Sequence, residues 1–336
     1  MTTTNTPRLR QRKTAYTFDY PQAIEFAETQ QRILWTAEEI EMEKDLHDLK
    51  TNLDEAELHG VMTVLKLFTQ YELNVGMDYW TNRVAKAFPR PDIERMANMF
   101  AYVEINVHAP FYAKINELLG VATDEFFESY KENKVLKERI DWIGNVVGAR
   151  MDNNLDILRS LGAFSMIEGA VLYSNFAFLK HFQAEGKNRL ANLVAGINFS
   201  VKDENIHAEA DAWLFRTLMR EASLTKAEQD KLREDMEKVA RKTYEHEHEI
   251  VKMIFEKGNI RGITANQLDN FVQSRIDLCL ENLGYESIFN PTYNPIQKWF
   301  YKNINSTKLH DFFAAQGSDY TRAWKETAFV WETDGE

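Results

Sequence analysis

The sequence predicts an all-α protein, a bundle of long helices in one large domain. The chain has 336 residues but only 14 glycines and 7 prolines, about half of average usage, which leaves too few helix breakers for many strands and turns. Its 44% of hydrophobic residues is ample for a single core. Neither a Ser/Gly-rich nor a Pro-rich run interrupts the chain, so we expect no linker between domains.

Capping residues and helix breakers place the helices along the chain. Asn52 or Asp54 can cap a first long helix, and the Pro-containing segment 88–91 separates it from the next. Gly120 can end that second helix. We expect long helices over about 54–80 and 92–119, one through Asn175 and one over 188–219, a surface helix over 124–139, and two outer helices over 225–257 and 264–283.

Two Glu–His pairs at helical spacing are the most informative feature of the sequence. Glu204 and His207 lie three residues apart, and Glu104 and His108 lie four apart, so each pair presents an oxygen and a nitrogen ligand on one helix face. A single carboxylate precedes each pair by 32 or 36 residues. Four carboxylates and two imidazoles inside a bundle form the ligand set of the ferritin-like di-iron or di-manganese proteins. The predicted metal ligands are Glu72, Glu104, His108, Glu168, Glu204 and His207.

The neighbours of these carboxylates distinguish them from ordinary surface charges. Glu168 is the only charged residue in the segment 164–173, and Glu104 lies among apolar residues as well. A buried carboxylate costs several kcal/mol unless it is paired or bound to a metal. The run 245–249 contains another Glu-x-x-His pair, but it is highly charged, so we expect a solvated helix surface there.

The ligand types indicate the chemistry of the site. Carboxylate oxygens can bridge two ions and suit iron or manganese, and imidazole suits iron as well. Mixed Glu and His ligation argues against structural zinc, which is normally held by Cys and His. We therefore expect oxygen activation by a reduced metal pair. The ligands alone do not distinguish iron stores, desaturases, hydroxylases and radical generators.

Further motifs occur in a fixed order along the chain. They are residues 33–39 (ILWTAEE), 65–72 (LKLFTQYE), 108–112 (HAPFY), 202–207 (KDENIH), 294–296 (NPI), 312–313 (FF) and 317–320 (GSDY). Together they resemble the small, radical-generating subunit of class I ribonucleotide reductases over most of the chain. Each match alone is weak, and the ordered set is specific.

The resemblance implies that the six ligands bind two metal ions per chain, iron first, with a manganese–iron or a manganese pair as alternatives. Tyr112, four residues after His108, would hold a stable radical. Leu172 and Phe176 would belong to the apolar pocket around Tyr112, since a phenoxyl radical survives only where water and reductants are kept away.

The resemblance also implies a path for the oxidising equivalent. Trp35 and Asp203 would form a hydrogen-bonded relay with His108, with Asp203 orienting the imidazole. Tyr320 in the tail would carry the oxidising equivalent onward to a large catalytic subunit, which reduces ribonucleotides to deoxyribonucleotides.

Two positions depart from the family pattern. Glu104 and His108 are separated by one residue more than the usual Glu-x-x-His. Both side chains can still point inward, because steps of three and four residues land on the same helix face, and a single-turn π-bulge would absorb the extra residue. Glu72 stands where iron–tyrosyl members commonly have Asp, as in relatives that use manganese and iron. Tyr112 favours the iron–tyrosyl members instead.

Charge and cysteine content bear on partners and location. A net charge of −12 argues against nucleic acid as a principal partner. No apolar run approaches the ~18 residues of a membrane span. Cys279 is the single cysteine and permits no internal disulfide, as expected in the cytoplasm. Reducing cysteines and nucleotide sites would then belong to the large subunit.

We expect a flexible N-terminal arm (1–20), a di-metal helical domain (21–306) and a C-terminal tail (307–336) that docks onto the large subunit, in a protein that is a homodimer. Two other functions stay open, a stand-alone di-metal oxidase or desaturase and a ferritin-like iron-storage protein. Neither gives a reason for Trp35, Asp203, Tyr112 and a C-terminal Tyr to occur together.

Overall fold

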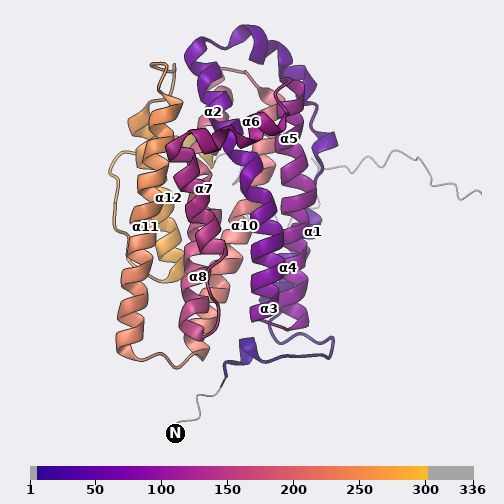
Figure 1. The fold of residues 1–336 in the computed structure, drawn as a ribbon, viewed down its shortest axis with the longest axis vertical. Coiled ribbons are helices and arrows are strands. Elements are labelled where there is room, and N and C mark those ends of the chain that lie inside the picture. Colours follow the sequence, from indigo (N-terminus) through magenta and orange to yellow (C-terminus); the bar gives the residue numbers. More distant parts are fainter. Residues whose placement is uncertain (1–5, 302–336) are drawn as a thin grey trace, which may run out of the picture.

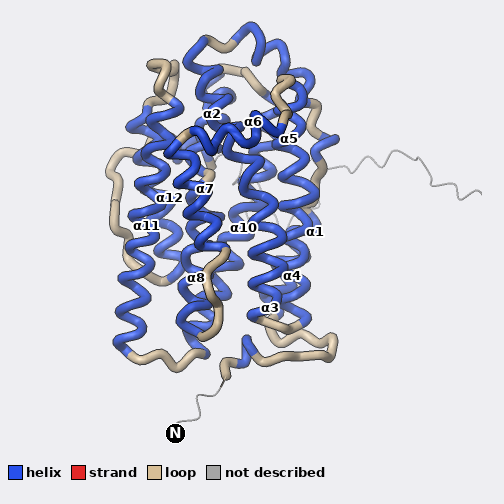
Figure 2. Tube along the Cα trace, in the orientation of Figure 1, coloured by secondary structure: helices blue, strands red, loops and turns tan. Residues whose placement is uncertain are grey.

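The computed structural model describes residues 6–301, and within that range it describes all side chains except those of residues 69–74, 127, 130 and 185. Every regular element in this part of the chain is a helix, as Figure 2 shows, apart from an isolated bridge between Ile260 and Ile263. The predicted all-α class is confirmed.

Four long helical segments form the inner bundle (Figure 1). α10 packs against α8, and α4 packs against the segment that continues α2. These segments agree with the four long helices predicted from the sequence. They are α2 (Glu55–Leu73) continued by η5 (Asn74–Val84) and α3 (Ala85–Ala87); α4 (Pro91–Val103), η6 (Glu104–His108) and α5 (Ala109–Leu118); α8 (Asn154–Met166), η8 (Ile167–Val171) and α9 (Tyr173–Lys180); and α10 (Ala191–Glu221).

Three of these four segments contain a π-helical stretch, namely η5, η6 and η8. A π-turn accommodates one residue more than an α-turn and is often found at functional sites. The π-turn predicted for Glu104–His108 is therefore present as η6. The stretches η5 and η8 were not predicted. The fourth segment, α10, is α-helical over all of its 31 residues.

The remaining helices pack outside this bundle. α1 (Pro21–Arg32) lies on α4, and α11 (Lys226–Ile254) lies on α8 and α12 (Ala265–Leu283). Capping boxes begin α11 at Thr225 and α12 at Thr264. Gly284, with φ of 91°, ends α12 in the left-handed conformation that glycine tolerates. Shorter helices complete the fold: α6 (Asp124–Glu128), α7 (Lys134–Val147) and α13 (Ile296–Phe300).

The two segments predicted as helix surface, 124–139 and 245–249, are partly buried. Arg139 of α7 and Glu247 of α11 are buried and form an ion pair with each other. His246 is buried as well, whereas Glu245 is exposed. The prediction was wrong at these positions because α11 packs on both α7 and α8. The charge content of each segment did not reveal that Glu247 and Arg139 are buried as a pair.

The described part of the predicted N-terminal arm lies against the helices. The buried Leu9 donates its backbone N–H to Glu221 at 2.7 Å, and Arg90 binds the carbonyls of Arg8 and Gln11. The boundaries at residues 20 and 306 stay predictions.

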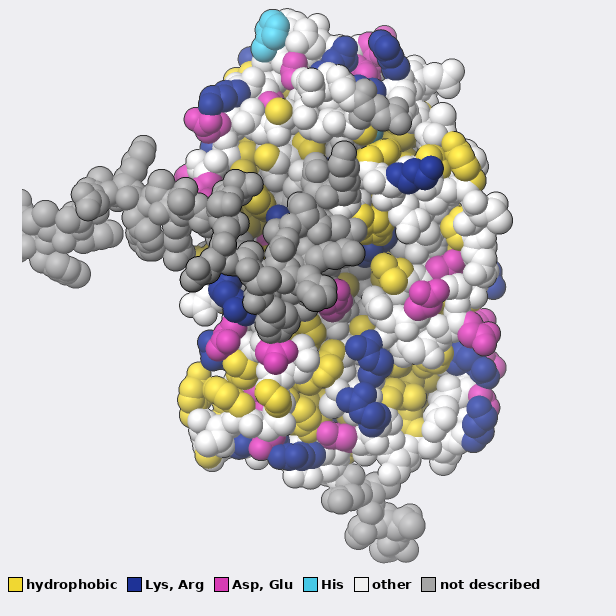
Figure 3. All heavy atoms as spheres, turned by 180° about the vertical axis from the view of Figure 1, so that it is seen from behind, with side chains coloured by type: hydrophobic (Ala, Val, Ile, Leu, Met, Phe, Trp, Pro, Cys, Tyr) yellow, Lys and Arg dark blue, Asp and Glu magenta, His cyan; other side chains and the backbone are white. Residues whose placement is uncertain are grey.

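The described helices were compared with the length and apolar character of a membrane span. Among the described helices, none combines the length and apolar character that a transmembrane segment needs. On the face seen in Figure 3, basic and acidic side chains are interspersed with hydrophobic ones, so positive charge does not gather in one area of that view.

Candidate metal centre

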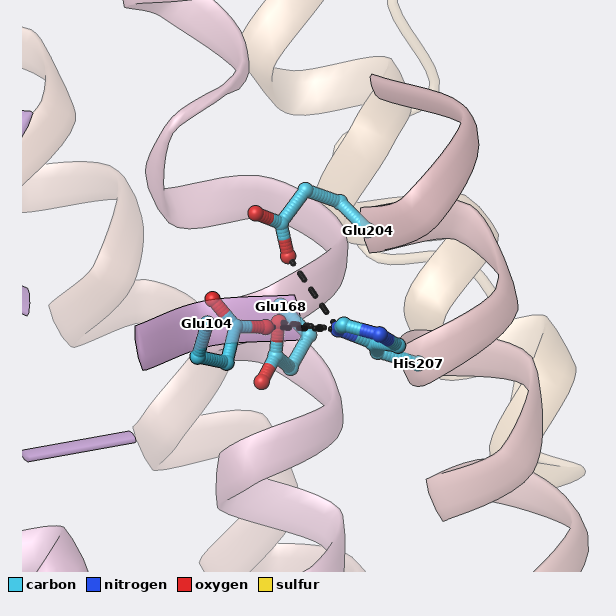
Figure 4. Close-up of side chains that lie close together, drawn as sticks. All are labelled: Glu104, Glu168, Glu204 and His207. Atoms are coloured by element: carbon cyan, nitrogen blue, oxygen red, sulfur yellow. Dashed lines mark ion pairs between the residues drawn. The ribbon is translucent and has the colours of Figure 1, made fainter. Parts of the chain in front are cut away.

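A cluster of buried acidic and imidazole side chains lies between the inner helices. It contains Glu104, Glu168, Glu204 and His207, and each offers a ligand atom within 4.8 Å of the others. Figure 4 shows the three carboxylates directed toward the His207 ring. In the described part of the chain this is the one group of its kind. It contains four of the six ligands predicted from the sequence.

The local helix geometry places each ligand. Glu204 and His207 are one turn apart on α10. Glu104 and His108 are the first and last residues of the π-turn η6, and Glu168 lies in the π-turn η8. The extra residue of η6 therefore lies between its two ligands and does not turn either one away from the centre.

His108, the fifth predicted ligand, also faces the cluster. Its Nδ1 lies 3.1 Å from Glu104 Oε2 and 3.3 Å from Glu204 Oε1. The Nδ1 atom of His207 lies 2.7 Å from Glu104 Oε1 and 3.8 Å from Glu204 Oε2. Glu104 and Glu204 thus each place one oxygen beside each imidazole, an arrangement suited to carboxylates that bridge two ions.

The electrostatics of the cluster fit a bound cation. Burial raises the pKa of Glu204, and the charges of Glu104 and Glu168 raise it further. For His207, burial lowers the pKa, but the hydrogen bond to Glu104 and the neighbouring carboxylates outweigh it and raise the pKa to about 9. Without a metal, protons must balance the buried negative charge. Hard carboxylate oxygens with imidazole nitrogen suit iron or manganese in place of those protons.

The sixth predicted ligand, Glu72, lies near the end of α2. Its side chain is outside the described set, so its role as a ligand stays a prediction.

The predicted relay residues lie together in the core. The indole Nε1 of Trp35 donates to Asp203 Oδ2 at 2.8 Å, and Nε2 of His108 lies 3.0 Å from the same oxygen. Gln30 donates to the other oxygen, Oδ1, at 2.8 Å. All four side chains are buried. No sequence motif indicated Gln30, whose place beside Asp203 follows from the packing of α1 against α4 and α10.

Tyr112 is buried beside the ligands. Its ring lies 6.3 Å from the ring of His108, and Phe68 stacks on it with 4.4 Å between ring centroids. Phe176 stacks on Phe68 in turn. The predicted Phe176 thus forms an outer layer of the Tyr112 pocket. Phe68, which stacks directly on Tyr112, lies inside the 65–72 motif and was not singled out.

A small cavity separates the carboxylates from apolar side chains. It measures about 10 Å³, room for about one water molecule. The predicted pocket residue Leu172 lines it. The other lining residues are Val75, Glu104, Ile167, Glu168, Val171 and Glu204.

Two buried arginines hold the π-turn that carries Glu168. Arg275 donates to the Gly169 carbonyl through Nε at 2.9 Å and through an Nη atom at 2.8 Å. Arg139 donates to the Val171 carbonyl at 2.5 Å. Charged hydrogen bonds of this kind are stronger than neutral ones and fix the backbone of the turn just after Glu168. Sequence reasoning missed both residues, because each lies in a helix that appears polar.

The predicted relay residue Tyr320 and the tail 307–336 lie outside the described residues. Their roles stay predictions.

Comparison with known proteins identifies the family. The family model for the ribonucleotide reductase small chain matches residues 12–295. A probable ribonucleoside-diphosphate reductase small subunit of Invertebrate iridescent virus 3 is 25% identical, covering 93% of this chain and 85% of the relative. The ribonucleoside-diphosphate reductase subunit beta of Bacillus subtilis is 27% identical, covering 87% of this chain and 86% of the relative.

Solved structures share the fold. A putative class I ribonucleotide reductase from Bacillus halodurans superposes with a TM-score of 0.76 at 21% identity, covering 84% of this chain and 100% of that one. The dimanganese(II)-NrdF of Streptococcus sanguinis gives a TM-score of 0.73 at 21% identity, covering 85% of this chain and 97% of that one. The family model spans most of the chain, and the chain therefore belongs to the ribonucleotide reductase small-chain family.

Proposed function

We propose that this chain binds two metal ions, reacts with oxygen and forms a radical on Tyr112 that a large subunit uses to reduce ribonucleotides. The observation that carries the proposal is the sharing of carboxylates. Glu104 and Glu204 each have one oxygen near His108 and one near His207, so two ions would be bridged while each keeps its own imidazole.

Iron is the first choice for both ions, with a manganese–iron or a manganese pair as alternatives. The described ligands are three carboxylates and two imidazoles, a set that these metals accept. A reduced pair of such ions supplies electrons to oxygen and thereby gains the power to oxidise a nearby phenol. Dimanganese binding is known for the Streptococcus sanguinis protein that shares this fold.

The surroundings of Tyr112 suit a long-lived radical. Its ring is buried between Phe68 and Phe111, which keep water and external reductants away. The cavity beside Glu168 admits about one small molecule. The protein thus limits what reaches the cluster as well as what reaches the tyrosine.

Asp203 connects the cluster with the outer helices. Its Oδ2 accepts hydrogen bonds from Trp35 and His108 together, so a proton can shift along the same contacts through which an electron leaves. Gln30 occupies the second oxygen and fixes the orientation of the carboxylate. We assign Trp35, Asp203 and His108 to the relay and Tyr320 to its continuation on the tail.

The partner would be the large subunit, reached through the tail 307–336, with the small chain as a homodimer. Aromatic residues spaced among acidic ones between 319 and 336 suit a peptide that docks in a groove. The lone Cys279 is buried, so the reducing cysteines would come from that partner, in a reducing compartment such as the cytoplasm. Family membership favours this function over the oxidase, desaturase and iron-storage alternatives.

The test is the Tyr112→Phe variant loaded with iron, manganese or both. It should keep both metals and its reaction with oxygen, because the hydroxyl is not a predicted ligand. It should lose the stable organic radical, measured by electron paramagnetic resonance minutes after oxygen is added, and nucleotide reduction with the large subunit. Full turnover by the variant would show that the oxidant is stored on the metals.

A further inference from the structure

A second buried tyrosine lies beside the helices that carry Glu168 and His207. Tyr79 belongs to η5 and is fully buried, and its Oη donates to Asp211 Oδ1 at 3.0 Å. Asp211 is also fully buried and lies one turn beyond His207 on α10. Its second oxygen, Oδ2, has no hydrogen-bond partner among the described residues.

Tyr79 packs against residues that lie one turn from predicted ligands. Its ring stacks on Phe164, one turn before Glu168 on α8, and the following residue, Trp80, lies edge-on to the His207 ring at 6.0 Å. The charge of Glu168 reaches both Tyr79 and Asp211. Tyr112 lies beside His108 instead. Tyr112 thus adjoins His108, whereas the residue that follows Tyr79 contacts His207.

Oxidising a buried phenol requires a proton acceptor. Burial raises the pKa of Tyr79 well above its usual value, and the charge of Asp211 raises it further, so the ring is a neutral phenol whose proton must leave with the electron. A base has to lie within about 2.6–3.2 Å of that proton's oxygen. Asp211 meets this requirement, because its Oδ1 lies 3.0 Å from the Tyr79 oxygen.

We propose that Tyr79 is a second oxidisable tyrosine of the metal centre and that Asp211 accepts its proton. The O–H bond of Tyr79 breaks, the proton forms a carboxylic acid on Asp211, and one electron passes to the metal pair that oxygen has oxidised. The products are a neutral tyrosyl radical, a protonated Asp211 and a metal pair reduced by one electron. The inference rests on the proposed function, because that function supplies the oxidant.

Tyr173 provides a matched control. It is fully buried like Tyr79, and its Oη donates to Asn205 Oδ1 at 2.7 Å. An amide oxygen accepts a hydrogen bond but does not take up the proton at neutral pH. The guanidinium of Arg275 lies 3.7 Å above the Tyr173 ring, and a cation at that distance opposes removal of an electron. Tyr173 should therefore stay reduced under the conditions that oxidise Tyr79.

The experiment uses the full chain with Tyr112→Phe, loaded with iron or manganese and frozen at intervals of milliseconds to seconds after oxygen is added. We expect a transient radical whose electron paramagnetic resonance spectrum narrows when the protein contains ring-deuterated tyrosine. Adding Tyr79→Phe should remove the signal, and adding Tyr173→Phe should leave it. Adding Asp211→Asn should slow its formation by about a hundredfold, within the range that a positioned base contributes.

Several results would overturn the inference. The first is a Tyr112→Phe sample that reacts with oxygen but shows no radical sensitive to tyrosine deuteration. The second is a radical signal that remains after Tyr79→Phe is added. The third is a radical signal that disappears when Tyr173→Phe is added. Circular dichroism and metal content of each variant verify that the fold and the cluster are intact, and Tyr79→Phe removes only a hydroxyl. If the wild-type chain forms no radical, the proposed function is wrong as well. If the wild-type chain forms the Tyr112 radical but the Tyr112→Phe variant forms no second radical, only this inference is wrong.

Discussion

The two Glu–His pairs of the candidate metal centre are built on helices of different winding. Glu204 and His207 are three residues apart on a regular α-helix, and Glu104 and His108 are four residues apart across a π-turn. Both pairs nevertheless direct their side chains to the same cluster. Residue spacing and helix winding therefore compensate each other, so a spacing that departs from the family pattern does not by itself indicate a lost site.

The surroundings of the two imidazoles also differ. The Nε2 atom of His108 contacts Asp203, which also accepts hydrogen bonds from Trp35 and Gln30. The Nε2 atom of His207 has no hydrogen-bond partner among the described residues. His108 is thus tied to a network that continues outward, whereas His207 is held mainly by the carboxylates it faces.

The largest expected effect follows from removing a carboxylate. Glu204→Ala should abolish binding of at least one of the two metal ions, because Glu204 has an oxygen beside each imidazole. Glu168→Ala should do the same, since this carboxylate faces the other ligands of the cluster. Metal analysis that still finds two ions per chain in both variants would show that the ligand assignment is wrong.

A smaller effect should separate the two windings. Inserting one Ala between Asn205 and Ile206 rotates Glu204 by about 100° relative to His207. Because α10 is packed against α8, α9 and α12, the helix cannot turn to restore both side chains. The affinity for Mn²⁺ should therefore fall about a hundredfold, which corresponds to roughly 2.7 kcal/mol. Deleting the exposed Asn106 should convert η6 into an α-turn and change affinity by less than about tenfold.

Asn106→Ala is the control for this pair of variants, because it removes only a side chain that binds the Tyr102 carbonyl. Affinities are measured by titration with Mn²⁺ followed by electron paramagnetic resonance. A deletion as damaging as the insertion would contradict the view that the π-turn merely absorbs one residue.

The sequence predicted the fold class, the inner helices and the π-turn at Glu104, because helical spacing and burial of carboxylates leave a visible pattern. It did not predict partners that approach from distant segments. Glu247 has no local signal for its ion pair with Arg139, and Asp211 meets Tyr79 from 132 positions away along the chain. Such pairs depend on how helices pack, which residue spacing within one helix does not encode.

The last expected effect is a gradual pH dependence of metal binding. The pKa of His207 is raised to about 9 from 6.5 in the metal-free fold. A raised pKa stabilises the metal-free fold below about pH 6.5, and this stabilisation is lost as the pH rises through about 9. Metal must displace that proton, so affinity for Mn²⁺ should rise with pH by up to about tenfold per unit and level off above 9.

Apparent affinities at three pH values between 6.5 and 9, with proton release followed by a dye, test this prediction. If the affinity does not change over this range, His207 is already neutral in the metal-free protein. That result would contradict the raised pKa that Glu104 gives to His207 through its hydrogen bond and its charge.

We propose that one cluster holds two ions, each with its own imidazole, across helices of different winding. Anomalous X-ray diffraction from crystals loaded with manganese or iron would locate these ions. We expect two peaks, one beside His108 Nδ1 and one beside His207 Nδ1, with oxygens of Glu104 and Glu204 near both. A single peak, or a His108 ring turned away from the metals, would contradict it.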